Sequence, residues 1–269
     1  MTSSPRPAGG PAMPSSATSA TTSATASPAP APLTVAVAQP VCAAAGRPDT
    51  VSENVALHAE AVRAAGTRLV VFPELSLTGY DLAAPAVGPA DARLAPLVAA
   101  CAATGAVALV GAPVAEADGR ESIATLVVTG EGAVVAYRKM RLHGAEVERF
   151  TPGEKPVTLE LDGLRLGLAI CADAADPAHA EETVALGVDA YVASTLYGPG
   201  AAQAERRDGH FRDRAAAHGV WCVLATCAGA TGEYPDSSGG SGVWAPGGEL
   251  LAQAGTAPGE LLRVELPRR

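Results

Sequence analysis

The sequence is poor in aromatic residues and has no long apolar run. Only 4% of its 269 residues are aromatic whereas 48% are hydrophobic, so alanine, valine and leucine must fill the core. No run of apolar residues approaches the roughly 18 that are needed to span a bilayer, which argues against a membrane-spanning protein. A chain of this length forms one large domain or two small ones.

Basic clusters and cysteine pairs are also lacking. The formal net charge is -9 and no basic cluster is present, which argues against nucleic acid and anionic membranes as partners. The five cysteines form an odd set without a CxxC pair, so the sequence suggests neither a disulfide framework nor a zinc site. We therefore expect a cytoplasmic protein without a metal or cofactor.

The chain divides into a tail and one domain. Residues 1–32 are almost entirely Ser, Thr, Ala, Pro and Gly, which cannot form a packed face, and we expect a disordered tail there. A secretory signal is a weaker interpretation, because the segment has no leucine-rich stretch and only Arg6 supplies charge. Residues 33–269 contain no linker-like break and no internal repeat, so we expect them to form a single domain.

Hydrophobic periodicity predicts alternating strands and helices at the start of the domain. The segment 33–39 (LTVAVAQ) is typical of a buried strand, and Thr50 with Glu53 predicts a capping box ahead of a helix that ends near Gly66. Residues 68–72 are the next apolar strand. Strand, helix and strand within about forty residues indicate a βαβ unit with parallel pairing, and a second such unit follows at once.

The second half of the domain mixes hairpins with further helices. Glycine-containing turns predict one hairpin around residues 130–132 and another at Asp162-Gly163, and the second strand of the latter ends at Cys171. Asp176-Pro177 predicts the N-cap and the first residue of a helix. The remaining segments predict a helix over 177–186, a strand over 189–194, a polar helix over 203–218, the strand VWCVLATCAG and antiparallel strands at the end.

Three apolar strands end in chemical groups whose roles are complementary. Glu74 follows one strand behind a proline, Lys139 ends a second strand, and Cys171 ends a third. A carboxylate can take the proton of a thiol, a thiolate can attack a carbonyl carbon, and an ammonium can lower the thiol pKa and stabilise an oxyanion. Taken singly, Cys171 could be a small buried hydrophobe, Glu74 a solvated loop residue and Lys139 a surface charge. Their occurrence together at strand ends favours a catalytic group.

The segments around these residues resemble three signature blocks of the nitrilase (carbon–nitrogen hydrolase) superfamily. The blocks are FPELSLTGY around Glu74, YRKMRL around Lys139 and GLAICADAADP around Cys171, in the order of the family. Supporting matches extend over most of residues 33–269, among them VAVAQP, ERFTPG and GGSGVWAPGGELLAQ. The resemblance implies an α/β fold, a four-layer α-β-β-α sandwich, that assembles into homodimers or higher oligomers.

The resemblance also implies a mechanism. Cys171 would attack the carbonyl carbon of an amide or N-carbamoyl substrate and form a thioester, which water activated by Glu74 would hydrolyse. Lys139 and the backbone N–H of Ala172 would bind the oxyanion that develops during the attack. The substrate implied is a small molecule.

Further site residues are expected from the family pattern and from position. In similar enzymes a second glutamate helps to position the catalytic groups, and here it would be Glu146 or Glu148. The distance of Glu146 from the FTPG turn favours Glu146. By position alone, the candidates for the substrate pocket are Tyr80, Thr195, Tyr197 and Arg149.

The sequence departs from the family pattern beside the nucleophile. Nitrile-hydrolysing members often have Trp-Glu after the cysteine, whereas Ala172-Asp173 follows here. This difference favours an amide or N-carbamoyl substrate over a nitrile, and the small side chain of Ala172 predicts a roomier pocket. Thr226 stands where asparagine is frequent. These departures concern the choice of substrate rather than the class of reaction.

Other functions are compatible with some of these residues. A Cys–His hydrolase would need an imidazole within hydrogen-bond reach of the sulfur, and no histidine lies in a recognisable motif. We expect His58 to be a half-buried helix residue and His143 a surface residue. A catalytically silent relative could act as a binding or assembly module, although all three catalytic residue types are present. Nitrile hydrolysis by the same triad is a further alternative.

Overall fold

The computed structural model describes residues 1–2, 31–43 and 46–268 of the chain. Its contacts group Ala31–Arg269 into one compact unit. The disordered tail expected over residues 1–32 lies almost wholly outside the described residues.

Two six-stranded sheets form the centre of this unit. The first sheet contains, in spatial order, β12 (Glu260–Leu266), β1 (Leu33–Gln39), β2 (Leu69–Val71), β3 (Val107–Ala115), β4 (Glu121–Thr129) and β5 (Gly132–Arg138). The second sheet contains β11 (Leu250–Gln253), β10 (Gly242–Trp244), β9 (Trp221–Thr226), β8 (Ala190–Thr195), β7 (Leu164–Ile170) and β6 (Thr158–Leu161). Strands β1 to β3 and strands β7 to β9 pair in parallel, as the βαβ pattern predicts.

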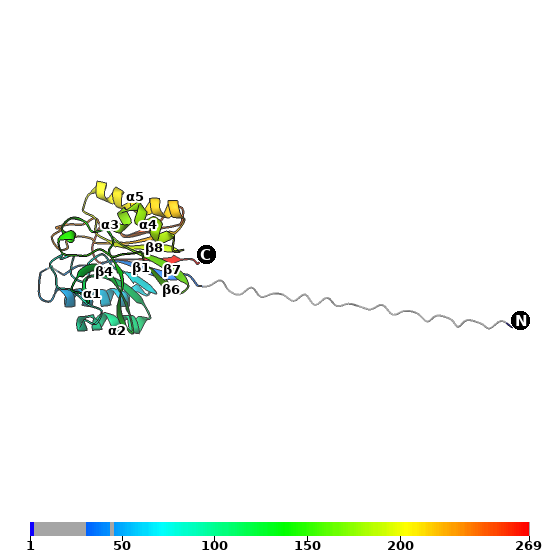
Figure 1. Cartoon of the computed structure of the whole chain (residues 1–269), viewed down its shortest axis with the longest axis horizontal. Helices are drawn as coiled ribbons and strands as arrows, with labels where there is room; N and C mark the ends of the chain where they lie inside the picture. Colours follow the sequence, from blue (N-terminus) through cyan, green and yellow to red (C-terminus); the bar gives the residue numbers. More distant parts are fainter. Residues whose placement is uncertain (3–30, 44–45, 269) are drawn as a thin grey trace. The chain divides into compact units, whose positions relative to one another are not determined.

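Helices cover the outer faces of both sheets (Figure 1). The first sheet is covered by α1 (Thr50–Ala65) and α2 (Ala95–Thr104), and the second by α3 (Ala172–Ala175), α4 (Pro177–Val184) and α5 (Ala201–His218). Two short 3₁₀ helices, η1 (Ala92–Leu94) and η2 (Gly144–Glu148), lie in connecting segments. This four-layer α-β-β-α arrangement confirms the fold that the family resemblance implies.

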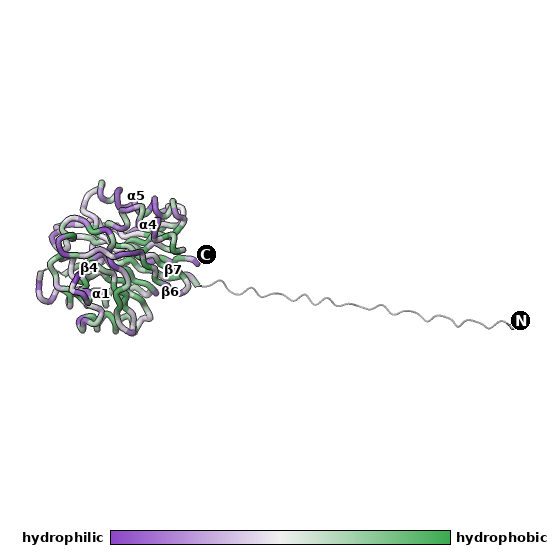
Figure 2. The backbone as a smooth tube through the Cα atoms, viewed as in Figure 1, coloured by the Kyte–Doolittle hydropathy of each residue, from purple (hydrophilic) through white to green (hydrophobic). Residues whose placement is uncertain are grey.

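The alternation of side chains along each strand divides the core into three layers. Val35 and Val37 of β1 belong to the apolar cluster between the sheets, whereas Ala36 and Ala38 pack with residues of α1 and α2. A third cluster, which includes Phe211 of α5, lies between the second sheet and its helices. Each fully buried valine or leucine contributes about 1.5–3 kcal/mol. Figure 2 shows the hydrophobic residues concentrated in the central strands.

Most element boundaries agree with the sequence. The helices α1 and α2 end at Gly66 and Gly105, and both glycines adopt the left-handed conformation that ends a helix. The carboxylate of Asp176 caps α4 by accepting a hydrogen bond from the N–H of Ala178 at 3.0 Å. The Asp162-Gly163 turn has φ angles of 49° and 82°, as the tight hairpin predicted there requires.

Two local predictions are wrong. The helix α1 begins at Thr50 itself and has Asp49 in the N-cap position, so Thr50 and Glu53 do not form the expected capping box. Instead the hydroxyl of Thr50 accepts a hydrogen bond from the N–H of Arg47 at 3.2 Å, and the opposite charge of Arg47 attracts the Glu53 carboxylate into an ion pair. His58 is fully rather than half buried.

The sequence does not predict α3 or the partner of β12. The helix α3 follows Cys171 directly, in a segment that has no helical periodicity because it is only one turn long. The strand β12 follows the second sheet in the chain but pairs with β1 of the first sheet, with Leu266 opposite Leu33. The final antiparallel strands are therefore divided between the two sheets.

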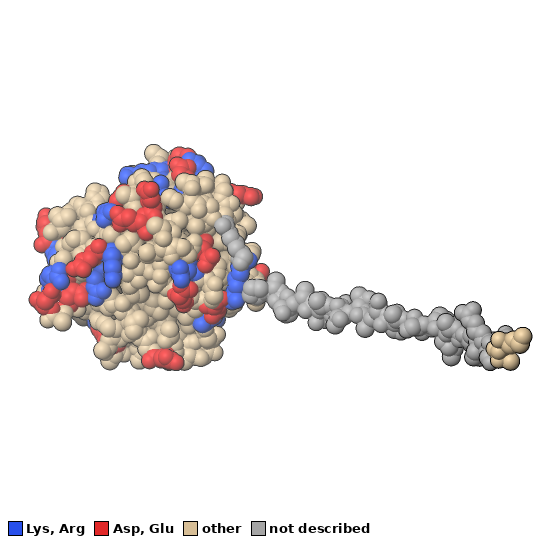
Figure 3. All heavy atoms as spheres, turned by 45° about the vertical axis from the view of Figure 1, so that its right-hand side comes forward, with Lys and Arg blue, Asp and Glu red and all other residues tan. Residues whose placement is uncertain are grey.

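Charges of both signs are mixed on the surface. On the face that Figure 3 shows, Lys and Arg side chains lie among Asp and Glu side chains and form no large patch of one sign. Among the described residues, no helix has both the length and the apolarity to cross a membrane.

Candidate active site

The residues that follow β2, β5 and β7 meet at one end of the sandwich. Glu74 comes after β2 behind Pro73, Lys139 comes directly after β5, and Cys171 comes directly after β7. The ammonium of Lys139 donates a hydrogen bond to Oε1 of Glu74 at 2.6 Å, and both side chains are fully buried. The structure therefore brings together three residues that are far apart in the sequence.

A tight turn presents the carboxylate of Glu74. Leu75, the next residue, has a φ of 50°, which is strained for a leucine. The turn packs against Gly111 of β3, where an added Cβ atom would lie 2.3 Å from the backbone nitrogen of Leu75. Because only glycine leaves room for this approach, Gly111 permits the turn that holds Glu74.

A second glutamate contacts the same ammonium group. Glu146 of η2 accepts a hydrogen bond from Nζ of Lys139 through Oε1 at 2.6 Å. Its other oxygen, Oε2, accepts one from the backbone N–H of His143 at 2.8 Å. Glu148 is exposed and has no ion pair among the described residues. Of the two glutamates considered from the sequence, the structure thus brings Glu146 to the lysine.

Cys171 has a strained backbone between β7 and α3. Its φ of 47° and ψ of -101° are uncommon for a residue with a side chain, and such strain is frequent at catalytic nucleophiles. Its N–H donates a hydrogen bond to the carbonyl of Ser194 at 3.0 Å, and Sγ lies 3.6 Å from the carbonyl oxygen of Leu196. The thiol is close enough to the carboxylate of Glu74 to lower the pKa of that glutamate slightly. Oε2 of Glu74 has no hydrogen-bond partner among the described residues.

Burial governs the proton affinities of this cluster. It raises the pKa of Glu74, against the opposing effect of the Lys139 ammonium. It disfavours the charge of Lys139, but Glu74, Cys171 and Glu146 together raise the pKa of the lysine above its ordinary value. Burial and Glu74 raise the pKa of Cys171 to about 12, although Lys139 lowers it as the sequence predicts. The resting thiol is therefore protonated, and a base must remove its proton before it can attack.

A cavity of about 800 Å³ opens above the nucleophile. It is lined by Cys171, Ala172, Glu146 and, among other residues, Tyr80, Arg149, His143, Tyr197, Arg206, His210 and Tyr234. Glu74 and Lys139 are not among the residues that line it. A space of this size accommodates a small molecule.

The pocket candidates from the sequence differ in their surroundings. Tyr80 is buried at the cavity wall, and Ala172, the first residue of α3, presents its backbone N–H beside the nucleophile. Arg149 lines the cavity, but its guanidinium is held by both carboxylate oxygens of Glu121, at 2.7 and 3.0 Å. Thr195 is not among the described lining residues. Its buried hydroxyl lies 3.5 Å from the carbonyl oxygen of Ala225.

Sequence reasoning missed two polar side chains that lie behind this site. Asp173 and Tyr137 are buried and hydrogen-bonded to each other at 2.7 Å. One signal was present in the sequence, because Asp173 is an acidic residue in an otherwise apolar segment two positions after Cys171. Nothing in the pattern of β5 marks Tyr137 as its partner.

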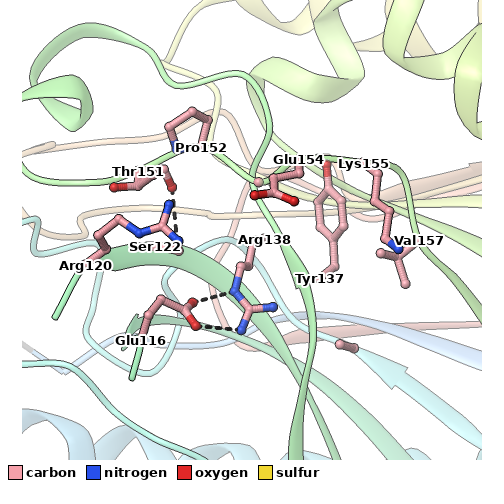
Figure 4. A pocket seen from close by; sticks show the side chains of 12 residues that line it. Glu116, Arg120, Ser122, Tyr137, Arg138, Thr151, Pro152, Glu154, Lys155 and Val157 are labelled. Carbon is pink, nitrogen blue, oxygen red and sulfur yellow. Dashed lines mark hydrogen bonds and ion pairs between the residues drawn. The ribbon is translucent and has the colours of Figure 1, made fainter. Parts of the chain in front are cut away.

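A second cavity, of about 270 Å³, lies near the end of β5 (Figure 4). Arg138 points from β5 to Glu116 and forms an ion pair with it, whereas the neighbouring Tyr137 points to the other side of the strand (Figure 4). None of Glu74, Lys139 and Cys171 lines this cavity. Within the described part of the chain, no group of three or more His, Cys, Asp and Glu side chains could hold a metal ion.

Most of the chain is similar to known hydrolase sequences. A family model described as carbon-nitrogen hydrolase matches residues 34–269. A hydrolase of Mycobacterium tuberculosis (strain H37Rv) is 30% identical over 223 residues, which cover 76% of this chain and 79% of that protein. An (R)-stereoselective amidase of a Pseudomonas species is 29% identical over 221 residues, which cover 78% of each chain.

The fold is also similar to solved structures of an amidase from Nesterenkonia AN1, a protein of the nitrilase superfamily. One variant of it has a TM-score of 0.75 and 26% sequence identity, over 89% of this chain and 92% of that chain. Another variant has a TM-score of 0.76 and 27% identity over the same shares, and it carries the acetamide moiety of fluoroacetamide covalently added at the active-site cysteine.

Proposed function

This chain belongs to the carbon–nitrogen hydrolase family, and from that premise we propose that it hydrolyses a small linear amide or N-carbamoyl compound through a thioester on Cys171. The observation that carries the proposal is the buried cluster of Glu74, Lys139 and Glu146 beside Cys171, at the base of a cavity of about 800 Å³. These groups supply a nucleophile, a base and a cation in one place.

The first half of the reaction forms the thioester. Oε2 of Glu74 takes the thiol proton of Cys171 while Sγ attacks the carbonyl carbon of the substrate. The oxygen of the tetrahedral intermediate accepts hydrogen bonds from the ammonium of Lys139 and from the N–H of Ala172. Glu74 then returns the proton to the nitrogen, the C–N bond breaks, and ammonia or an amine leaves.

The second half regenerates the enzyme. A water molecule loses a proton to Glu74 and attacks the thioester carbon, and the same two donors stabilise the new oxyanion. The C–S bond breaks, the thiolate of Cys171 takes the proton from Glu74, and a carboxylic or carbamic acid leaves. The raised pKa of Glu74 makes its carboxylate a stronger base than an exposed glutamate, which suits both proton transfers.

The surroundings of the nucleophile support an amide rather than a nitrile. The side chain of Ala172 at the cavity wall is small, and the Trp-Glu pair of many nitrile-hydrolysing relatives is absent at Ala172-Asp173. The similar Pseudomonas protein is named as an amidase, and the Nesterenkonia amidase carries an acetamide moiety on its cysteine. Arg206 lines the cavity and has no ion pair among the described residues, so amides with a distal carboxylate belong in the set of test substrates.

The test is the release of ammonia from a panel of substrates. The panel contains acetamide, butyramide, succinamic acid, N-carbamoylglycine and propionitrile. We expect turnover of at least one amide or carbamoyl compound, and Cys171→Ala should abolish it while the thermal unfolding temperature stays close to that of the wild type. Cys101→Ala is the matched control and should remain active, because it removes a buried thiol of α2 that does not line the cavity.

Two outcomes would contradict the proposal. Full activity of Cys171→Ala would exclude the thioester mechanism. A wild-type protein that turns over no member of the panel, and whose Cys171 is alkylated by iodoacetamide no faster than Cys101, would favour a catalytically silent member of the family. Turnover of propionitrile alone would assign the same triad to nitriles.

A further inference from the structure

One buried carboxylate connects the segment of the lysine to the segment of the cysteine. Oδ1 of Asp173 accepts hydrogen bonds from the backbone N–H groups of Met140 and Arg141, at 3.1 and 2.7 Å. Oδ2 accepts one from the N–H of Ile170 at 3.0 Å and one from the hydroxyl of Tyr137 at 2.7 Å. The side chain of Asp173 is fully buried, and all four donors are within the described part of the chain.

These four donors immediately surround the two reactive residues in sequence. Tyr137, Met140 and Arg141 lie within two positions of Lys139, and Ile170 directly precedes Cys171. The strands that end at these residues belong to different sheets, because β5 is an edge of the first sheet and β7 is part of the second. No ladder of backbone hydrogen bonds therefore fixes Lys139 relative to Cys171. Asp173 provides a buried polar link at this point, beside the ion pair of Arg141 with Asp176 and the contact of Tyr137 with His179.

The hydroxyl of Tyr137 is itself held in one orientation. It donates to Asp173 and lies 2.8 Å from Nε2 of His179, while Nδ1 of His179 lies 2.9 Å from the hydroxyl of Tyr191. Since the single proton of Tyr137 goes to Asp173, Nε2 of His179 must be the donor to Tyr137. Burial lowers the pKa of His179, so the ring is neutral and its Nδ1 accepts from Tyr191.

Asp173 does not belong to the cavity. It is absent from the described residues that line the space above Cys171, and its four acceptor positions are filled by protein donors. Burial raises its pKa, whereas His179, Tyr137 and the backbone donors act in the opposite direction. Any effect of this carboxylate on the reaction must therefore pass through the groups that it holds.

We propose that Asp173, with Tyr137 as its partner, is a positioning residue that sets the geometry between the ammonium of Lys139 and the sulfur of Cys171. The inference rests on the proposed function, because it concerns the catalytic roles of these two groups. A misplacement of about 1 Å between reacting groups costs about 100-fold in rate. A carboxylate that accepts four hydrogen bonds from segments of both sheets can prevent such a shift.

The test replaces Tyr137 by phenylalanine and measures three quantities. Tyr137→Phe keeps the ring in the core but removes one of the four donors to Asp173. We expect kcat to fall about tenfold with KM nearly unchanged, because substrate contacts stay in place while the transition state loses alignment. The apparent pKa for alkylation of Cys171 by iodoacetamide should rise, because a less firmly held Lys139 stabilises the thiolate less. The third quantity is the thermal unfolding temperature.

Tyr191→Phe is the matched control. It removes a buried hydroxyl that hydrogen-bonds to Nδ1 of His179. The protein thus loses one buried hydrogen bond, as in Tyr137→Phe, but all four donors to Asp173 remain. We expect a similar decrease in the unfolding temperature, but wild-type kcat and a wild-type alkylation profile. In Asp173→Asn an amide NH₂ group replaces one acceptor oxygen and faces N–H or O–H donors that it cannot accept from. This variant should lower kcat further than Tyr137→Phe and shift the alkylation profile in the same direction.

The outcomes distinguish failure of the positioning role of Asp173 from failure of the proposed hydrolase function. If Tyr137→Phe and Tyr191→Phe lose kcat in proportion to stability and leave the alkylation profile unchanged, the network is only structural and the inference is overturned. If Asp173→Asn does not fold, the pair of tyrosine variants still decides. If the wild type hydrolyses none of the test compounds, the proposed function fails, but the alkylation profile still reports the geometry of Lys139 and Cys171 without a substrate.

Discussion

Glu74 and Glu146 contact the same ammonium group but have different second partners. Oε2 of Glu74 has no hydrogen-bond partner among the described residues, whereas Oε2 of Glu146 accepts a hydrogen bond from the backbone N–H of His143 at 2.8 Å. Under the proposed mechanism Glu74 exchanges protons with the nucleophile, and Glu146 holds the ammonium of Lys139 in place.

We predict that isosteric replacement of these two glutamates has unequal effects. Glu74→Gln removes the base and should lower kcat/KM by about 10³-fold, within the usual range for general acid–base catalysis. Glu146→Gln keeps an oxygen near Lys139 and should lower it only about tenfold. Steady-state ammonia release with the best substrate of the panel measures both. Equal losses in the two variants would contradict this division of roles.

At the level of residues, what could be predicted depends on the range of the interaction. Glu74, Lys139 and Cys171 are identifiable because each follows an apolar strand, and this is a local pattern. The hydrogen bonds of Asp173 could not be predicted, because its four donors lie in or directly after two strands of different sheets, β5 and β7. Thr195 illustrates a related limit, because the prediction for it depended on position alone. Side chains alternate along a strand, so a position at a strand end does not say which face it occupies.

At the level of elements, β3 controls the turn that carries Glu74. The N–H of Gly111 donates a hydrogen bond to the hydroxyl of Ser76 at 3.3 Å, and the carbonyl of Gly111 accepts one from the N–H of Leu77 at 3.0 Å. We predict that Gly111→Ala displaces the turn, destabilises the protein by about 1–3 kcal/mol and removes most of the activity, because its Cβ atom would lie 2.3 Å from the backbone nitrogen of Leu75.

Gly88→Ala is the control for this substitution. Gly88 has no atom within 4 Å of its added Cβ position and no positive φ, so the same chemical change should leave both stability and activity close to wild type. Chemical denaturation and ammonia release measure the two effects. An active Gly111→Ala variant of normal stability would show that β3 does not constrain Glu74.

The helix α1 contributes a pH-dependent contact to the first sheet. The ring of His58 stacks on Phe72, with centroids 4.1 Å apart, and neither ring nitrogen makes a regular hydrogen bond among the described residues. Burial lowers the pKa of His58 from the ordinary 6.5 to about 3, and the backbone of Asn54 opposes this only in part. The folded protein thus keeps the ring neutral where the unfolded chain would protonate it.

This difference predicts how stability changes with pH. Above pH 6.5 the ring is neutral in both states, and below that value the unfolded state binds a proton that the folded state excludes down to a pH of about 3. Stability from His58 is therefore lost as the pH falls, by about 1.4 kcal/mol for each pH unit. His58→Leu should flatten the fall of the unfolding temperature, and His218→Leu should not. An unchanged slope in His58→Leu would contradict the assignment.

At the level of the whole molecule, the site depends on the position of one sheet relative to the other. Glu74 and Lys139 come from the first sheet and Cys171 from the second. The chain passes to the second sheet after β5 and returns to the first sheet after β11, where β12 pairs with β1 over seven residues from Leu33 to Gln39. This return could not be predicted from periodicity, because β12 alternates in the same way as the strands of the second sheet.

The two ends of the chain should therefore differ in what their removal does. Residues 1–30 are not part of the compact unit Ala31–Arg269. Their deletion should therefore leave kcat/KM and the unfolding temperature close to those of the full chain. Deletion of residues 260–269 removes β12 and exposes the hydrogen-bonding edge of β1, so it should prevent cooperative unfolding and abolish activity. Circular dichroism during heating and ammonia release measure both variants. A cooperative, active protein without β12 would show that β1 to β5 hold Glu74 and Lys139 by themselves, whereas loss of activity on removal of residues 1–30 would give the tail a role in the site.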